Sequence, residues 1–318
     1  MMVYEARDSD LSALRFGVSP LSELCLSLRV LRAPTTYPVP AGWHAHVARQ
    51  VGDLDLELLT ALVNQRLGTP DFLNPRPELP LPRLCDELQT VATLPADAIE
   101  LDLEDLWPEN RPEVLRGPTP ALRGRILAQV QAYWDRCFSP FWPAFRSVLR
   151  ADIRHRSTQI ADHGLRHMLD ALTPSLTFDG TRLACDNRVG TSYEAAIAGR
   201  GLVLVPSLFT LNISYPAVAR SSPTLIYPAR GHGNLHTLTA RADDHLTALV
   251  GDVRAQLLST LSEPRTTKEL ALLLGKTSSA VNQQLRSLTA AGLLDTTRDG
   301  RSVLYGLSDL GSRLVRPT

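Results

Sequence analysis

The stretch TTKELALLLGKTSSAVNQQLRSLTAAGLLDTTRDGRSVLYGL, residues 266–307, decides the fold of the C-terminal part of the chain. Thr266 and Glu269 fit the capping-box pattern, in which a hydroxyl and a carboxylate each accept a backbone N–H, so a helix is expected to begin here. Leucines at helical spacing follow, and Gly275 stands where a left-handed closing residue is least strained. The stretch therefore begins with a short helix that ends at Gly275.

A second helix is expected to begin after Thr277, whose hydroxyl can cap it, and to run to about Ala291. Its inward positions, at threes and fours, are apolar: Val281, Leu285 and Leu288. Its outward positions are polar and include no carboxylate: Ser278, Ser279, Asn282, Gln283 and Arg286. A helix with this outward face suits a groove of double-stranded DNA.

Two strand-like runs follow, Leu294 to Arg298 and Arg301 to Leu307. Between them stands Asp299-Gly300, the dipeptide preferred in a two-residue type I′ turn. The pattern predicts a β-hairpin with Arg298 and Arg301 beside the turn. Both guanidinium groups would then be placed to meet phosphates or a minor groove while the preceding helix contacts base edges.

In order and spacing, ELALLLGKTSSAVNQQLRSLTAAGLL (269–294) followed by TRDGRSVLYGLS (297–308) resembles the ArsR/SmtB family of bacterial winged helix-turn-helix regulators. The resemblance implies a transcriptional regulator that binds operator DNA as a homodimer, in most members as a repressor that a ligand releases. It also implies that the second helix enters the major groove. The expected DNA-binding residues are Thr277, Ser278, Ser279, Asn282, Gln283, Gln284, Arg286, Arg298 and Arg301.

The resemblance covers about the last quarter of the chain and has one departure. Where many relatives carry a Cys-x-Cys pair for metal sensing, this chain has Thr266 and Lys268, neither of which can bind a soft metal there. The long N-terminal part resembles the large uncharacterised domain of some actinobacterial members, judged from GLVLVPSLF (201–209) and TLIYPARG (224–231). A small-molecule effector for that part is left open, and no cofactor is expected.

The length of 318 residues is sufficient for two domains, each with its own core. Gly231 to Asn234 marks the boundary, so residues 1–240 are expected to form a regulatory or dimer-supporting domain and residues 241–318 the DNA-binding domain. The fold class expected is α+β and mainly helical. It combines an N-terminal helical domain that has a small β-sheet with a C-terminal winged helix-turn-helix.

Charge and composition limit the partners. Lys plus Arg and Asp plus Glu both number 33, so no global field draws the chain to nucleic acid or membrane. From Pro264 onward, however, eight basic residues stand against four acidic ones. No signal peptide and no apolar run of the roughly 18 residues that span a bilayer are seen. With four widely spaced cysteines, these features favour a cytoplasmic protein.

The N-terminal part yields several local expectations. Ser19 and Pro20 should start a helix that buries Leu24, Leu28 and Leu31. An acidic, solvated loop is expected over 97–105. One helix should run from Ser139-Pro140 to about Leu172, with His167 on its inward face, and a small antiparallel sheet should form from 176–186, 201–209 and 224–229. Another single helix is expected over 243–262, with Leu246, Leu249 and Val253 in its apolar stripe.

Other functions are weighed against DNA binding. His163 and His167 are four apart on a helix, a spacing that can place two imidazoles on one metal, and His232 and His236 share it, but no third ligand is evident. An aromatic cluster is read as core or as a ligand pocket: Trp134, Phe138, Phe141, Trp142 and Phe145. No catalytic motif is found, so an enzyme is not expected. A protein-interaction module that uses the winged helix to dimerise remains the alternative.

Overall fold

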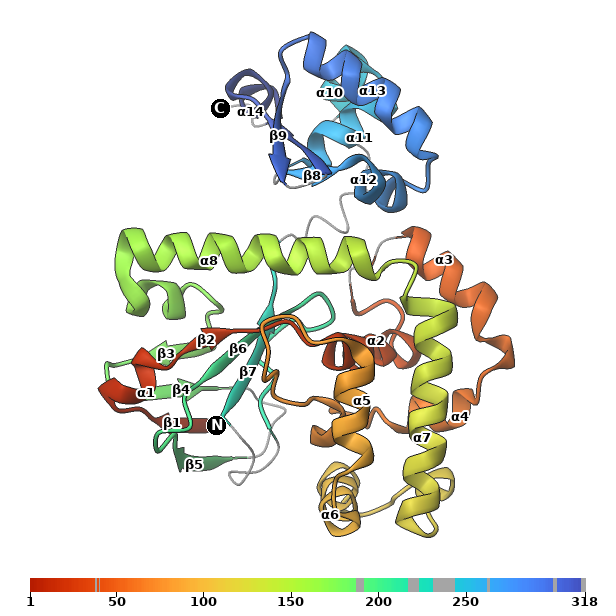
Figure 1. Cartoon of the computed structure of the whole chain (residues 1–318), viewed down its shortest axis with the longest axis vertical. Coiled ribbons are helices and arrows are strands. Elements are labelled where there is room, and N and C mark those ends of the chain that lie inside the picture. Colours follow the sequence, from red (N-terminus) through yellow and green to blue (C-terminus); the bar gives the residue numbers. More distant parts are fainter. Residues whose placement is uncertain are drawn as a thin grey trace. The chain divides into compact units, whose positions relative to one another are not determined.

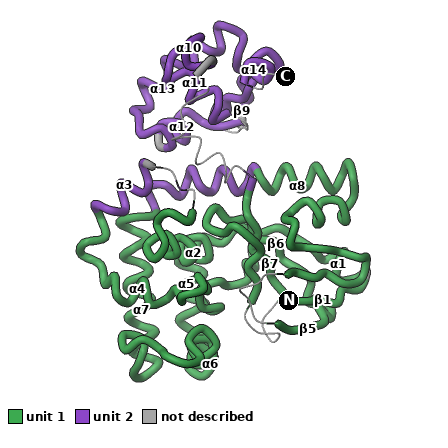
Figure 2. Tube along the Cα trace, turned by 180° about the vertical axis from the view of Figure 1, so that it is seen from behind, with its two compact units in different colours: residues 1–37, 50–138, 152–229 green, residues 38–49, 139–151, 230–318 purple. Residues whose placement is uncertain are grey.

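The computed structural model describes residues 1–37, 39, 41–186, 192–216, 223–230, 244–261, 264–299 and 302–315. The chain divides into two compact units, which are described separately (Figure 2). Unit 1 comprises residues 1–37, 50–138 and 152–229, and unit 2 comprises residues 38–49, 139–151 and 230–318. In the part of the chain that is described, no helix combines the length and apolar character needed to cross a membrane.

Unit 1 contains two small sheets (Figure 1). In the four-stranded sheet, ordered β3-β4-β1-β5, β1 runs antiparallel to β4 and parallel to β5. In the three-stranded sheet, ordered β2-β6-β7, all strands are parallel. The strands are β1 (Met2–Glu5), β2 (Arg15–Phe16), β3 (Leu176–Phe178), β4 (Arg182–Cys185), β5 (Tyr193–Ala196), β6 (Val203–Ser207) and β7 (Thr224–Pro228).

The prediction of a single antiparallel sheet is wrong, because β6 and β7 form a parallel pair. All five residues of β6 are buried, and so are the first four of β7, so both faces of these strands are covered. Such near-continuous apolar runs are typical of parallel strands, whereas antiparallel strands with one solvated face alternate. The segment 176–186 does form an antiparallel pair, the β3–β4 hairpin, in which Asp179 Oδ1 accepts the N–H groups of Thr181 and Arg182 at 2.9 and 2.7 Å.

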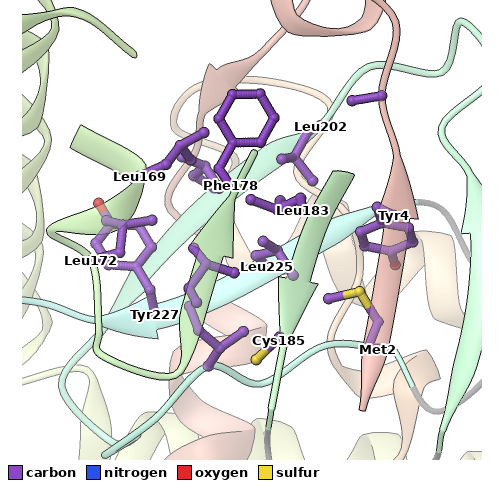
Figure 3. Packing of buried hydrophobic residues seen from close by; sticks show 14 of the residues in the cluster. Met2, Tyr4, Leu169, Leu172, Phe178, Leu183, Cys185, Leu202, Leu225 and Tyr227 are labelled. Carbon is purple, nitrogen blue, oxygen red and sulfur yellow. The ribbon is translucent and has the colours of Figure 1, made fainter. Parts of the chain in front are cut away.

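Residues from both sheets and from the end of α8 (Trp142–Asp170) form one hydrophobic core in unit 1 (Figure 3). Met2 and Tyr4 of β1 lie within it together with Tyr227 of β7. The Tyr227 hydroxyl donates to the buried Asp152 carboxylate at 2.7 Å. This bond satisfies the one polar group that Tyr227 brings into the apolar interior.

Helix α2 (Pro20–Arg32) is buried on nearly every side, and not only along the leucine positions that were predicted. Ser19 caps it as predicted by accepting the Ser22 N–H at 2.9 Å. Leu24 and Leu28 are fully buried, but Leu31, predicted to be inward, is only half-buried. Polar residues of α2 are buried as well, which requires partners from distant segments.

Among the remaining helices of the N-terminal part is α6 (Ala96–Leu106), which covers the segment predicted to be a loop. Ile99, Leu103 and Leu106 lie at threes and fours and are buried, so residues 97–105 belong to a helix, and the expected acidic loop is wrong. Asp102 is buried among them and accepts the Phe72 N–H at 2.6 Å. The helices are α1 (Asp8–Ser12), α3 (Ala41–Gln50), α4 (Leu56–Ala61), α5 (Leu84–Ala92), α6 (Ala96–Leu106) and α7 (Thr119–Tyr133), which continues as a π-helical turn (Trp134–Phe138).

Gly164 interrupts α8, for which an unbroken helix was predicted. Its φ of +84° is in the region that favours glycine, so the helical face before it does not continue after it. His167, predicted to point inward, follows this break and is exposed. His163, which precedes the break, is exposed as well. In the aromatic cluster, Phe138 and Phe145 are 0% and 1% exposed, which fits the interpretation as core.

Candidate nucleic-acid interface

The described residues from 244 to 315, here called the C-terminal module, have a hydrophobic core of their own. Its helices are α10 (Asp244–Val250), α11 (Asp252–Thr260), α12 (Thr267–Leu274), α13 (Ser278–Ala290) and α14 (Asp309–Val315). Its strands, ordered β8-β10-β9, are β8 (Arg265–Thr266), β9 (Leu294–Asp299) and β10 (Ser302–Leu307). The predicted DNA-contact residues that the structure describes lie at the start of α13, within α13 and in β9.

The single helix predicted over 243–262 is instead two helices, α10 and α11. Gly251 separates them with a φ of +83°, which ends the first helical run. Leu246 is buried as expected, but Leu249, assigned to the same apolar stripe, is 68% exposed. Gly231 to Asn234, the predicted domain boundary, and the pair His232 and His236 lie outside the described residues.

The caps of α12 and α13 are confirmed. The Thr266 N–H donates to Glu269 Oε2 at 2.7 Å, and the Glu269 N–H donates to the Thr266 hydroxyl at 3.3 Å, which is the reciprocal capping box. Gly275 follows α12 with a φ of +62°. The Thr277 hydroxyl accepts the Ala280 N–H at 3.3 Å and so caps α13. These contacts fix the short connection between the two helices.

The outward face of α13 carries most of the predicted contact residues. Val281, Leu285 and Leu288 are buried in the module core and thereby orient the helix. The exposed residues among those predicted are Thr277, Ser278, Ser279, Gln283 and Arg286, and Asn282 is half-buried. The helix itself contains no Asp or Glu. The exposed face of α13 is therefore polar and free of negative charge.

Gln284 is separated from this face. It is half-buried, and its side-chain oxygen accepts the Nε–H of Arg254 on α11 at 2.9 Å. Gln284 therefore supports the packing of α13 against α11, whereas the resemblance had placed it near the bases.

The hairpin β9–β10 differs from the prediction by one residue. Asp299 pairs with Ser302, so two residues, 300 and 301, separate the paired positions, and the predicted Asp299-Gly300 turn is one position too early. Arg298 is exposed near this end of β9 and pairs with Val303. Arg301, also predicted to contact DNA, lies outside the described residues.

The cations of the C-terminal module are not equally accessible. Arg265, counted in the local surplus of positive charge, is 6% exposed, and its Nε–H donates to the Thr260 carbonyl at 3.2 Å. Lys276 lies in the connection before α13 and is exposed, although it was not selected as a contact residue. The connection, α13 and the hairpin therefore present three exposed cations among the described residues: Lys276, Arg286 and Arg298.

A close approach in α14 provides a test of the packing behind the hairpin. A Cβ added to Gly311 would lie 2.1 Å from the Leu293 carbonyl oxygen, which accepts the Ser308 N–H at 3.1 Å. We expect Gly311→Ala to destabilise the C-terminal module by about 1–3 kcal/mol, as overpacking does, measured by urea denaturation. Gly124→Ala in α7, where a Cβ meets nothing within 4 Å, should instead raise stability. Equal effects would contradict this packing.

The histidine pair does not gain a third ligand. The rings of His163 and His167 lie 4.9 Å apart and both side chains are exposed. Among the residues for which the structure gives positions, no group of three or more His, Cys, Asp or Glu could hold a metal ion. The metal-sensor alternative thus rests on two exposed imidazoles alone.

The chain was compared with protein-family models, with curated proteins and with solved structures. None of the three comparisons gives a match.

Proposed function

We propose that this protein is a DNA-binding transcriptional regulator whose C-terminal module is a winged helix-turn-helix. In this proposal α12 is the positioning helix, α13 the recognition helix and the β9–β10 hairpin the wing. The observation that carries the proposal is the polar face of α13, which lacks carboxylates and is followed by the exposed Arg298 on the hairpin. A protein-interaction surface would more often be apolar at this place.

The residue types on this face match the chemistry of base recognition. The major groove of B-DNA admits an α-helix, and Asn or Gln can pair with adenine through two hydrogen bonds, while Arg pairs in the same way with guanine. Gln283 and Arg286 are exposed and three residues apart, so both can reach the same groove. Arg298 and Lys276 would contact phosphates, which position the protein without reading sequence.

We further propose that the protein binds as a homodimer and acts in the cytoplasm as a repressor. Two recognition helices related by a two-fold axis would enter successive major grooves about one helical turn apart. Leu249 on α10 and Leu310 on α14 are 68% and 56% exposed, and apolar side chains of this kind are suited to a subunit interface. Unit 1 would carry the regulatory or dimer-supporting role.

The proposal is tested by fluorescence anisotropy with the DNA upstream of the protein's own gene and with an unrelated duplex, at several salt concentrations. Arg298→Ala should weaken binding to all sequences. Because each phosphate contact contributes about 0.9 to the log–log salt slope, a homodimer that loses two contacts should show a slope about 1.8 less steep. Gln283→Ala should instead change sequence preference, since a base contact of this kind discriminates by about 1–3 kcal/mol.

A matched control separates these effects from net charge. Arg154→Ala removes an exposed arginine on α8, outside the C-terminal module, and should leave both affinity and salt slope unchanged. If Arg298→Ala and Gln283→Ala behaved like Arg154→Ala, or if the protein bound neither duplex at low salt, the assignment of α13 and the hairpin to DNA would be wrong.

A further inference from the structure

Unit 1 contains a cavity of about 1360 Å³, partly open to solvent, that the proposed DNA contacts do not use. Its walls come from α2, from residues 64–76, from α6 and the segment after it, from residues 210–216 and from β7, several of which are labelled in Figure 1. Each of these five segments contributes an apolar side chain to the lining: Leu26, Phe72, Leu106, Ile213 and Ile226. Cavities lined mainly by apolar groups with a few polar ones are typical of small-molecule sites.

Arg29 of α2 is the unusual group in this cavity. It lines the cavity, yet it is only 7% exposed. Its guanidinium donates to the Phe209 carbonyl at 3.4 Å and to the Ser214 hydroxyl at 3.4 and 3.5 Å, all near the upper limit for a hydrogen bond. Its Nε–H has no partner among the described residues.

Arg29 has no counter-ion among the described residues, since none of the ion pairs there involves it. Tyr37, which also lines the cavity, is a side-chain hydrogen-bond partner of Arg29. Glu23 is on the same helix, but burial raises the pKa of its carboxyl to about 7, and it accepts the Leu208 N–H at 2.8 Å. A guanidinium stays charged in proteins, and a buried charge without a counter-ion is strongly unfavourable.

We propose that the cavity of unit 1 binds a small organic monocarboxylate, whose carboxylate pairs with the buried Arg29 guanidinium and whose apolar body lies against the aliphatic and aromatic walls. A planar guanidinium and a carboxylate match in geometry and can form two parallel hydrogen bonds. The hydrogen bonds that the guanidinium makes to Phe209 and Ser214 are long, and its Nε–H has no partner among the described residues. This site is independent of DNA binding by the C-terminal module.

The charged residues that line the cavity favour a ligand with one negative charge over a phosphate dianion. Five arginines and six Asp or Glu residues line the cavity, so its general field is not positive. Arg111 pairs with Glu100, and Arg76 donates to the backbone carbonyls of Arg200 and Gly201 at 2.6 and 3.1 Å. A phosphate dianion would need a second cation beside Arg29 and would be repelled by the acidic residues of the lining.

The test uses isothermal titration calorimetry on the full chain with three kinds of probe. The first is a set of carboxylates, the straight-chain acids from butanoate to dodecanoate and three phenylalkanoates. The second is the primary amide of each of these carboxylates, and the third is hexyl phosphate. We expect at least one carboxylate to bind saturably below millimolar concentration. Its amide should bind about 10- to 100-fold more weakly, as expected when a charge-assisted pair is lost. Absence of saturable carboxylate binding, equal binding of the amide, or tighter binding of hexyl phosphate would overturn the proposal.

Variants identify the residue. Arg29→Met should weaken carboxylate binding by a similar factor without lowering the thermal stability of the unliganded protein, because an apolar side chain of similar size replaces an unpaired buried charge. Arg29→Lys keeps the charge but loses the planar fork, so its affinity should be intermediate. Arg116→Met, at a lining arginine that pairs with Glu113 at 3.0 Å and is 54% exposed, is the matched control and should bind normally. Unchanged affinity in Arg29→Met would contradict the site.

Discussion

Leu285→Ala is expected to destabilise the C-terminal module by about 2–5 kcal/mol, the usual effect of truncating a fully buried leucine. Leu285 is 0% exposed and belongs to the module core. Folded domains have only roughly 0.05–0.15 kcal/mol of stability per residue, so a module of this size would lose a large share of its total. The variant should therefore fail to bind DNA at physiological temperature.

The measurement must report on the C-terminal module alone. All four tryptophans lie outside it, Trp107 and Trp134 in unit 1 and Trp43 and Trp142 in the two earlier segments of unit 2. Tryptophan fluorescence therefore contains no signal from within the module. Hydrogen exchange read by mass spectrometry resolves α13 and β10 separately. We expect faster exchange in both elements of Leu285→Ala, while the urea transition seen by tryptophan fluorescence stays where it is in the unmodified protein.

Arg286→Ala is the control on the same helix. Arg286 is exposed, so its replacement should change stability by no more than about 0.5 kcal/mol, and hydrogen exchange in α13 should remain slow. DNA affinity should nevertheless fall, because the proposed contact is lost. If Leu285→Ala left exchange in α13 unchanged, or shifted the tryptophan transition by the same amount, the C-terminal module would not be a separate cooperative unit.

The parts of the module that were predicted correctly depend on contacts within a few residues. The capping box joins Thr266 to Glu269, and the cap of α13 joins Thr277 to Ala280. Helical spacing alone identified Val281, Leu285 and Leu288 as buried. Such features are visible in sequence because both partners stand within one turn of helix.

Other features depend on partners that are distant in sequence. β1 is four residues long and is held by β4 and β5, about 180 residues later, so no local pattern distinguishes it from a loop. The placement of Gln284 depends on Arg254, thirty residues earlier. The exposure of Arg29 to a cavity depends on segments 64–76 and 210–216. Tertiary packing determines each of these positions, and local propensity does not.

Two wrong predictions, the loop over 97–105 and the single helix over 243–262, could have been corrected from the sequence alone. Ile99, Leu103 and Leu106 have helical spacing in and beside the segment that was predicted to be a loop. The loop was predicted because the segment is rich in Asp and Glu. Those carboxylates lie mostly on the solvated side of α6, which an amphipathic helix requires. Gly251 likewise stands inside an apolar periodic stretch, where an isolated glycine lowers the expectation of an unbroken helix.

A strong dependence of stability on pH is the second large effect expected, and it comes from two buried carboxyl groups of unit 1. Glu23 and Glu87 are 2% and 5% exposed, and burial raises the pKa of each from 4.5 to about 7. Glu23 accepts the Leu208 N–H at 2.8 Å, and Glu87 accepts the Leu21 N–H at 2.8 Å. Arg29 opposes the shift at Glu23, and Asp86 adds to it at Glu87.

The direction of the effect follows from proton linkage. Between pH 4.5 and about 7 the folded protein keeps a proton on each carboxyl that the unfolded chain has already released, so unfolding releases protons and becomes easier as pH rises. The stabilising contribution is complete below pH 4.5 and is lost as pH rises through 7. With about 1.4 kcal/mol for each pH unit, the interval is worth about 3 kcal/mol per carboxyl.

Glu23→Gln and Glu87→Gln test this linkage, because glutamine keeps an acceptor oxygen for the Leu208 or Leu21 N–H but cannot ionise. Relative to the unmodified protein, each variant should have equal stability near pH 4 and should gain up to about 3 kcal/mol by pH 8, measured by urea denaturation followed by tryptophan fluorescence. Glu113→Gln, at a side chain that is 83% exposed, should show no such trend. A difference between variant and unmodified protein that stayed constant from pH 4 to 8 would mean that both buried carboxyls ionise at their ordinary pKa. It would follow that the interior of unit 1 around α2 is better solvated than its burial indicates.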